Sequence, residues 1–336
     1  ASKHGLHVLD VEMWRYARLV KRPSQRPGLV EEHRPGAEAL LMGARVRIDE
    51  RGFRHADPAT EARRRPGERV VAALGDSLTF GWGVDEADTW PDQLERLLRR
   101  RCPDGGATVL NAGIGNSNTG MHRARYEELV RPLRPDWVIL GWFINDAEPA
   151  PVPSENPLLW RSALAGLFST RWRQGAEVHL RDFRAYYGGL YRGDQPGWRA
   201  ARQALRALGA RLRQDGAAAT LLLLPELHEP RAFVSFAEIY GQVAKEAHAA
   251  GFEVIDSSPA FPPGAGDRFW VSPTDAHPNA AAHRIFAVAA ARSRHACGRS
   301  QYRRGARRIS FSDRARRAAP PSARRRSPGS GRRRCR

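Results

Sequence analysis

The sequence lacks any apolar run that approaches the roughly 18 to 20 residues a helix needs to cross a lipid bilayer. We therefore expect no transmembrane segment in this chain. Because the sequence starts at Ala1 rather than at Met, an N-terminal signal or anchor can have been removed. The compartment stays open on this evidence, with an extracytoplasmic or membrane-associated location in a bacterium as one option.

Cysteine is also scarce. The chain contains only Cys102, Cys297 and Cys335, and their spacing fits no metal-ligand motif. We therefore expect no closed disulfide framework, no metal centre and no cofactor.

Acidic residues are nearly absent from one end of the chain. Residues 299–336 contain 15 arginines and a single acid, Asp313, and so carry +14 of the net charge of +19. The remainder is only mildly basic. Few apolar residues are present to offset the entropy of ordering, so we predict a disordered Arg-rich tail over 298–336. Such a tail contacts polyanions without specificity, but it matches no nucleic-acid-binding module, and we expect no specific nucleic-acid partner.

Between these ends, short apolar runs alternate with helical patterns, which predicts a parallel sheet covered by helices on both faces. The predicted strands cover residues 70–74, 108–110, 136–143, 218–224 and 252–255, and the predicted helices cover 90–101, 121–130, 197–214, 231–250 and 280–294. Residues 270–279 are predicted to form a loop. We expect an N-terminal extension over 1–66, with a short helix at 8–21 and a strand and turn at 44–54. The main domain then covers 67–297, with a helical insertion at about 150–195.

The first apolar run stops abruptly at Gly75-Asp76-Ser77. Open α/β sheets carry their active groups at the carboxyl ends of such strands, so Ser77 sits where a nucleophile belongs. The alternative is an ordinary turn, because Gly, Asp and Ser are all turn-forming residues. The choice depends on whether other loops supply partners.

Acyl transfer needs a nucleophile, a base that takes its proton and a group that orients the base. Ser77, His277 and Asp275 have the correct residue types for these three roles. A lone histidine in a loop is more often a surface residue. A role of His277 as the base is favoured because a carboxylate precedes it by two residues and Pro278-Asn279 leads into a helix.

The reaction also needs hydrogen-bond donors for the oxyanion of the tetrahedral intermediate. The Asn145 side chain can supply one N–H group, because Asn145 follows the third predicted strand. The backbone N–H groups of Ser77 and of Gly115 or Asn116 can supply others.

Four blocks follow one another along the chain: Gly75-Asp76-Ser77-Leu78, Asn111-x-Gly113, Asn145-Asp146 and Asp275-x-His277-Pro278-Asn279. Their order resembles that of the SGNH/GDSL hydrolase family over about residues 70–296. This resemblance implies a flavodoxin-like three-layer α/β/α fold with a central parallel sheet of about five strands. It also implies a serine esterase or O-acyltransferase that acts on an ester of a carbohydrate or a lipid.

The resemblance also implies roles for individual residues: Ser77 is the nucleophile, His277 the general base and Asp275 its orienting acid, and Asn145 and a backbone N–H of the second block form the oxyanion hole. Together with the donors named above, we expect Ser77, Asn116 and Asn145 to form the oxyanion hole and Asp76, Gly115 and Asp146 to support the site. Asp76 is expected to brace the nucleophile loop. For Asp146, a structural role and a direct role both stay open.

The chain departs from the family pattern at two positions. Asn116 stands where the second block commonly has a glycine, which puts the close approach of the backbone in doubt. The common spacing Asp-x-x-His would place Thr274 in the position of the acid. The shorter Asp275-x-His277 spacing resembles that of SGNH-like polysaccharide O-acetyltransferases.

A flavodoxin-like protein that binds a phosphate through Gly113–Gly120 is an alternative. The Asp275-His277 pair separates the two hypotheses, because a phosphate-binding protein does not need it. The insertion also carries aromatic residues that either line a substrate cleft or pack against the core, and core packing is the favoured interpretation. These aromatic residues are Trp160, Phe168, Trp172, Tyr186, Tyr187 and Tyr191.

Overall fold

The computed structural model describes residues 8–55, 68–102, 107–149, 183–228, 232–264 and 266–297. All of them belong to the first of two units of the chain, Ala1–Cys297. The predicted Arg-rich tail and the aromatic residues Trp160, Phe168 and Trp172 lie outside the described residues. Within the described ranges, no helix is both long enough and apolar enough to cross a membrane.

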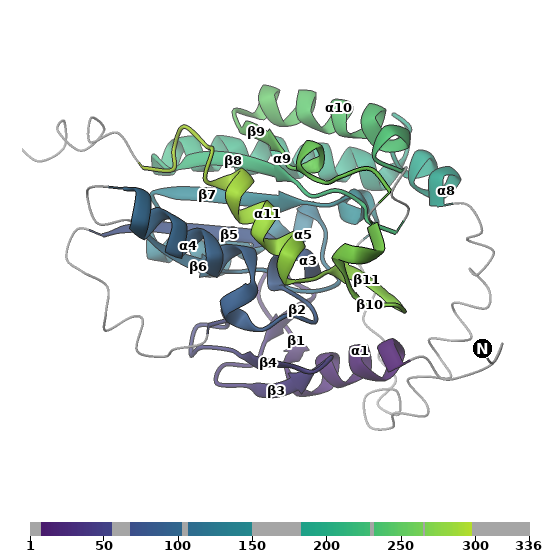
Figure 1. Ribbon diagram of the computed structural model, residues 1–336. Coiled ribbons are helices and arrows are strands. Elements are labelled where there is room, and N and C mark those ends of the chain that lie inside the picture. Colours follow the sequence, from purple (N-terminus) through teal and green to yellow (C-terminus); the bar gives the residue numbers. More distant parts are fainter. Residues whose placement is uncertain are drawn as a thin grey trace, which may run out of the picture. The chain divides into compact units, whose positions relative to one another are not determined.

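The centre of the fold is a five-stranded parallel sheet (Figure 1). Its strands are β5 (Arg69–Gly75), β6 (Ala107–Asn111), β7 (Trp137–Trp142), β8 (Ala218–Leu223) and β9 (Glu253–Asp256). They lie in the order β6-β5-β7-β8-β9, and every neighbouring pair is parallel. This is the flavodoxin-like strand order, so the predicted fold class is confirmed.

Helices cover both faces of this sheet. They are α4 (Trp90–Arg101), α5 (Thr119–Arg125), α9 (Pro196–Asp215), α10 (Ala232–Ala250) and α11 (Ala280–Ala290). Helices α4 and α11 pack together on one face, and α9 packs between α5 and α10 on the other. Every residue of β6 and β7 is buried, as expected for strands covered on both sides.

The described end of the insertion packs onto the core. Helix α8 (Phe183–Leu190) follows the part of the insertion that the structure leaves undescribed. Tyr187 and Tyr191 are 9% and 3% exposed and belong to the main apolar cluster. For these two tyrosines, the interpretation as core packing agrees with the structure.

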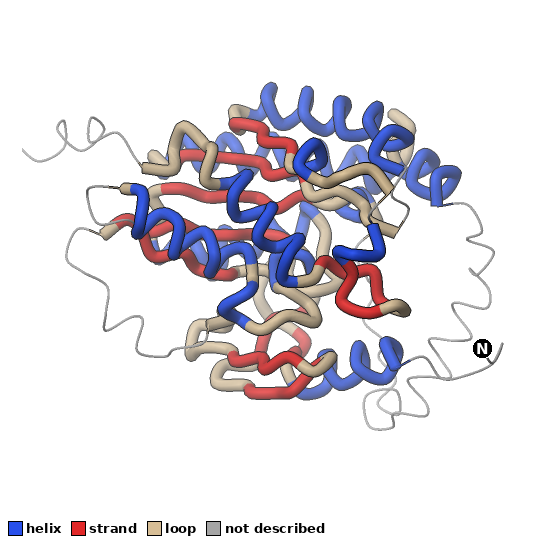
Figure 2. The backbone as a smooth tube through the Cα atoms, viewed as in Figure 1, coloured by secondary structure: helices blue, strands red, loops and turns tan. Residues whose placement is uncertain are grey.

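The N-terminal segment (residues 8–55) forms a helix and two short antiparallel strand pairs (Figure 2). Its elements are α1 (Val8–Leu19), β1 (Lys21–Pro23), β2 (Glu31–His33), β3 (Glu38–Leu41) and β4 (Ala44–Arg47). Strand β1 pairs with β2, and β3 pairs with β4. Buried apolar side chains of the segment pack against Phe80 and Trp82, just beyond Ser77. The segment therefore touches the region of the predicted nucleophile.

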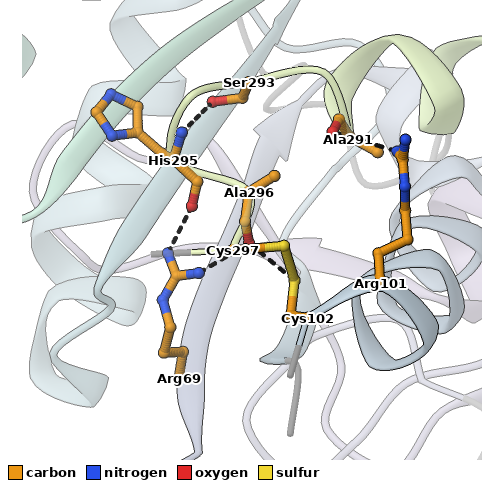
Figure 3. Close-up of a disulfide and its surroundings, with 8 residues drawn as sticks. All are labelled: Arg69, Arg101, Cys102, Ala291, Ser293, His295, Ala296 and Cys297. Atoms are coloured by element: carbon orange, nitrogen blue, oxygen red, sulfur yellow. Dashed lines mark hydrogen bonds between the residues drawn. A yellow bond between two sulfur atoms is a disulfide. The ribbon is translucent and has the colours of Figure 1, made fainter. Parts of the chain in front are cut away.

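The structure corrects the expectation about cysteine. A disulfide joins Cys102, at the end of α4, to Cys297, with the two Cα atoms 5.1 Å apart (Figure 3). Beside it, the Arg69 guanidinium donates to the backbone carbonyls of Ala296 and His295 at 2.8 and 2.9 Å. The pairing escaped the sequence because the two cysteines are 195 residues apart. Only the packing of α11 beside α4 brings the chain back to Cys102.

Candidate active site

Ser77 lies at a sharp turn between β5 and the short helix α3 (Ser77–Phe80). Gly75 makes this turn possible: its φ is +152°, and a Cβ atom there would overlap the Thr79 side chain and the Gly141 carbonyl. The Asp76 carboxylate accepts a hydrogen bond from Leu78 N–H at 2.9 Å and caps the helix. Ser77 is the first residue of α3, so its own N–H has no acceptor within the helix.

The second loop runs from the end of β6 towards Ser77. Its start is fixed by the Ile114 N–H, which donates to the Gly75 carbonyl at 3.0 Å. Gly113 lies so close to α3 that a Cβ atom there would overlap the backbone of Thr79 and Phe80. The loop is thus held directly against the helix that begins at Ser77.

Asn116 has a φ of +61°, which is the left-handed conformation that glycine usually occupies. Asparagine tolerates this conformation better than other side chains do. The departure from the family glycine therefore keeps the backbone geometry of the loop. Among the described residues, no acceptor binds the Asn116 N–H.

Asn145 follows β7, in a single 3-10 turn over Ile144–Ala147. Because Gly75 and Gly141 are paired in register, the segments after β5 and β7 leave the sheet side by side. No acceptor within the described residues binds the Asn145 side-chain Nδ2. Asn145 and Ser77 therefore lie at the same edge of the sheet, each with an uncommitted N–H group.

Residues 270–279, predicted as a loop, form an antiparallel hairpin instead. Strands β10 (Trp270–Ser272) and β11 (Asp275–Pro278) pair through Trp270 with Pro278 and Ser272 with Asp275. These strands are three and four residues long, too short to show an alternating pattern in the sequence. The Asn279 side chain then caps α11 by accepting from the N–H groups of Ala281 and Ala282.

The hairpin brings His277 to Ser77. The Ser77 Oγ lies 3.0 Å from His277 Nε2, and the His277 Nδ1 lies 2.6 Å from Asp275 Oδ1. The same carboxylate oxygen accepts the His277 backbone N–H at 3.0 Å, which closes a tight turn. Thr274 is exposed, and its hydroxyl contacts Ser272 rather than His277. The acid that faces the imidazole is therefore Asp275.

A third group holds the Asp275 carboxylate. The indole N–H of Trp82, which is 2% exposed, donates to Asp275 Oδ2 at 2.9 Å. Burial of Asp275 raises its pKa, but the hydrogen bonds and charge of His277 and the Trp82 N–H outweigh this effect, so the pKa lies below its usual value. Asp275 is thus held ionised, and the Nδ1 of His277 is its donor. The Nε2 of His277 then faces the Ser77 hydroxyl, in position to accept its proton.

Asp146 and Asp76, two of the predicted supporting residues, are both almost fully buried. Asp146 accepts from Phe143 N–H and from the Thr119 hydroxyl, each at 3.0 Å, and lies 3.0 Å from His122 Nε2. Burial, assisted by the nearby charge of Asp146, raises the pKa of Asp76 to about 6 against the bond from Leu78 N–H. The structure thus gives both acids contacts that fix the loops carrying Ser77 and Asn145.

The remaining predicted residue, Gly115, has its N–H occupied. It donates to the Tyr16 hydroxyl at 3.1 Å, and the Gly115 carbonyl accepts from Lys21 Nζ at 3.3 Å. These contacts of Tyr16 and Lys21, and the contact of Trp82 with Asp275, were not predicted from the sequence. The signal for Trp82 was its position between two glycines close to Ser77. Tyr16 and Lys21 lie in a mixed region whose sequence offers no such signal.

Within the described ranges, no group of three or more His, Cys, Asp or Glu side chains is arranged to hold a metal ion.

Comparison with known proteins finds solved structures and one protein family that are similar to this chain. The chain is similar in structure to a variant of Axe2, an acetyl xylan esterase from Geobacillus stearothermophilus, with 22% identity over 67% of this chain and 94% of that chain and a TM-score of 0.45. It is also similar to LAE5, an alpha/beta hydrolase enzyme from the metagenome of Lake Arreo, Spain, with 21% identity over 68% and 95% of the two chains and a TM-score of 0.43. No curated protein matches the sequence. The model of the GDSL-like Lipase/Acylhydrolase family matches residues 73–285, which is more than half of the sequence, and the chain belongs to this family.

Proposed function

We propose that the protein is a serine hydrolase that cleaves an ester-linked acyl group through Ser77, His277 and Asp275. The observation that carries this proposal is the continuous set of hydrogen bonds from Ser77 Oγ through the imidazole to Asp275. Membership of the GDSL-like Lipase/Acylhydrolase family supports ester hydrolysis as the coarser activity. The residue roles below belong to the proposal.

In the first half-reaction, Ser77 Oγ attacks the ester carbonyl carbon while His277 Nε2 takes the hydroxyl proton. Asp275, held ionised by Trp82 and the His277 N–H groups, stabilises the imidazolium that forms. The tetrahedral intermediate collapses by breaking the bond to the leaving oxygen, and His277 returns the proton to that oxygen. An acyl group stays on Ser77.

In the second half-reaction, a water molecule attacks the acyl-serine with His277 again as the base. The products are the free acid and regenerated Ser77. If a hydroxyl group of an acceptor replaces water, the same step transfers the acyl group. The proposal therefore covers both an esterase and an O-acyltransferase, and a carbohydrate or lipid ester is the proposed substrate class.

Three N–H groups form the proposed oxyanion hole. They are the backbone N–H groups of Ser77 and Asn116 and the side-chain Nδ2 of Asn145. Each is uncommitted to an acceptor in the described part of the chain, which leaves it available for a developing negative charge. The N–H of Gly115 is excluded from this set because the Tyr16 hydroxyl accepts it.

The phosphate-binding alternative finds little support in the second loop. A phosphate cradle needs several backbone N–H groups directed at the ligand. Here the N–H groups of Gly113, Ile114 and Gly115 donate to Asn111 Oδ1, the Gly75 carbonyl and the Tyr16 hydroxyl. The proposed acyl transfer uses the N–H groups that remain uncommitted, those of Ser77, Asn116 and the Asn145 side chain.

The test is turnover of short and long p-nitrophenyl esters, with and without carbohydrate acceptors, by wild type and Ser77→Ala. Ser77→Ala should fold normally and lose turnover by several orders of magnitude, with residual catalysis from the oxyanion hole. Ser272→Ala is the matched control, because Ser272 lies in the neighbouring hairpin outside the hydrogen-bonded set. Near wild-type turnover by Ser77→Ala would refute the proposal, and acceptor-dependent products would identify transfer.

A further inference from the structure

We propose that Lys21 is a positioning residue of the oxyanion hole. Its buried ammonium group holds the carbonyl of Gly115 and thereby fixes the peptide group whose N–H, on Asn116, is a proposed oxyanion donor. This inference rests on the proposed function, since it explains how one donor of that site is held in place.

Lys21 is unusual because it is only 3% exposed. Lysine is almost never fully buried unless its charge is paired. Its Nζ forms an ion pair with the Glu31 carboxylate, donates to the Gly115 carbonyl at 3.3 Å and lies 5.0 Å from the centre of the Tyr16 ring. The charge is thus neutralised by Glu31 and directed at the second loop.

The contact with the Gly115 carbonyl bears on the Asn116 N–H because both groups belong to one peptide unit. That unit is planar and trans, so its C=O and N–H point in opposite directions. A cation that holds the carbonyl from one side therefore sets the direction of the N–H on the other. It also polarises the peptide group and strengthens the N–H as a donor.

The need for such a restraint arises at Asn116. Asparagine adopts this left-handed conformation, with φ of +61°, more readily than other side chains do but less freely than glycine. Contacts that hold the peptide group before Asn116 therefore help to fix a conformation that a glycine would adopt at no cost. The Lys21 ammonium group, which comes from the N-terminal segment, therefore helps to hold the loop at Asn116, the residue that replaces a glycine within the region matched by the family model.

The other side of Gly115 is held by a second chain of contacts. Gly115 N–H donates to the Tyr16 hydroxyl at 3.1 Å, and the oxygen of that hydroxyl lies 2.8 Å from His33 Nε2. Burial, together with the charge of Arg125, holds the pKa of His33 well below its usual value, so the ring is neutral. Its Nδ1 donates to the Gly52 carbonyl at 3.1 Å, which leaves Nε2 to accept the Tyr16 hydroxyl proton.

These contacts come from the N-terminal segment, whereas the family match begins at residue 73. Tyr16 and Lys21 together hold both polar groups of Gly115. The extension is thus assigned a part in the chemistry in addition to covering Phe80 and Trp82.

The test compares Lys21→Met with Lys21→Arg in the full chain, with kcat and KM measured on a p-nitrophenyl ester. Lys21→Met keeps the length of the side chain and removes the charge. It should lower kcat by roughly 10- to 100-fold, somewhat less than complete loss of one oxyanion donor, with KM nearly unchanged. Lys21→Arg keeps a cation and should recover a substantial part of kcat.

Val46→Ala is the control for a purely structural role. Val46 is buried in the same segment, in β4, and its apolar side chain cannot form a hydrogen bond or an ion pair with Gly115. It should lower the melting temperature while leaving kcat unchanged. Equal kcat for Lys21→Met and Val46→Ala, or a loss below about threefold for Lys21→Met, would overturn the inference.

A second variant keeps the test decisive if Lys21→Met does not fold. Tyr16→Phe removes only the hydroxyl that accepts the Gly115 N–H, and it should lower kcat several-fold without changing KM. An unchanged kcat in this variant would then overturn the inference. Ser77→Ala distinguishes the two levels: if it retains turnover, the proposed function fails and the role of Lys21 fails with it. If it loses turnover while the Lys21 variants do not, only the role of Lys21 fails.

Discussion

The Trp82→Phe substitution should slow the proposed reaction without unfolding the protein. It removes the indole N–H that donates to Asp275 Oδ2 at 2.9 Å, while an aromatic ring remains in the apolar cluster. A hydrogen bond to a charged group contributes about 1.5 to 3 kcal/mol. Since about 1.4 kcal/mol corresponds to a tenfold change in rate, we expect kcat to fall by roughly 10- to 150-fold. The pKa of Asp275 should rise, because one of the bonds that lower it is lost.

The matched control for this substitution is Trp90→Phe. Trp90 is also fully buried, but its indole N–H has no acceptor among the described residues, so the change removes volume without removing a hydrogen bond. Both variants should lose comparable stability in urea denaturation, and only Trp82→Phe should lose kcat. Equal kinetic losses in the two variants would refute the argument that Trp82 acts through Asp275.

Three further predictions follow from the same contacts. Asp275→Asn should lower kcat by up to about 10⁴-fold with little change in melting temperature, whereas Thr274→Val should have a far smaller effect; reversed effects in ester assays would refute the assignment of the acid. Because the folded-state pKa of Asp76 is raised from 3.8 to about 6, its contribution to stability is complete below pH 3.8 and is lost as the pH rises through about 6. Asp76→Asn should therefore remove up to about 3 kcal/mol of that pH-dependent loss, measured by urea denaturation at several pH values, and an unchanged pH dependence would contradict this. Cys102→Ser removes the disulfide to Cys297 and should lower the free energy of unfolding by roughly 2 to 4 kcal/mol. It should leave kcat unchanged, because Cys102 precedes β6 and so lies near the amino ends of the strands, whereas the site lies at their carboxyl ends. A loss of kcat without a loss of stability would contradict this prediction.

The central sheet could be predicted because its strands are apolar runs separated by helices with a clear pattern. Helix α4 illustrates this, since its bounds, Trp90–Arg101, are those predicted. The candidate site could be predicted because Ser77 and Asn145 lie just beyond the ends of strands β5 and β7, and the carboxyl ends of parallel strands meet at one edge. Local sequence was sufficient to predict those strands, helices and loop residues whose structure depends on a single segment of the chain.

The rest depends on contacts between distant segments, which no local pattern encodes. The hairpin that carries His277 has strands of three and four residues, held by Ser77 and Trp82 rather than by their own propensity. The Cys102–Cys297 disulfide depends on the packing of α11 beside α4. A lysine in an N-terminal region without a clear pattern is expected to be exposed to solvent, so the burial of Lys21 became evident only in the structure.

The most direct measurement of the central claim is the site of covalent labelling by a fluorophosphonate, a reagent that captures activated serine nucleophiles. Intact-protein and peptide mass spectrometry should find one adduct, on Ser77, in the wild type. Labelling should be abolished in Ser77→Ala and strongly slowed in His277→Ala, because the base that activates Ser77 is removed. An adduct on another serine, or ester turnover by a protein whose Ser77 stays unlabelled, would contradict the account.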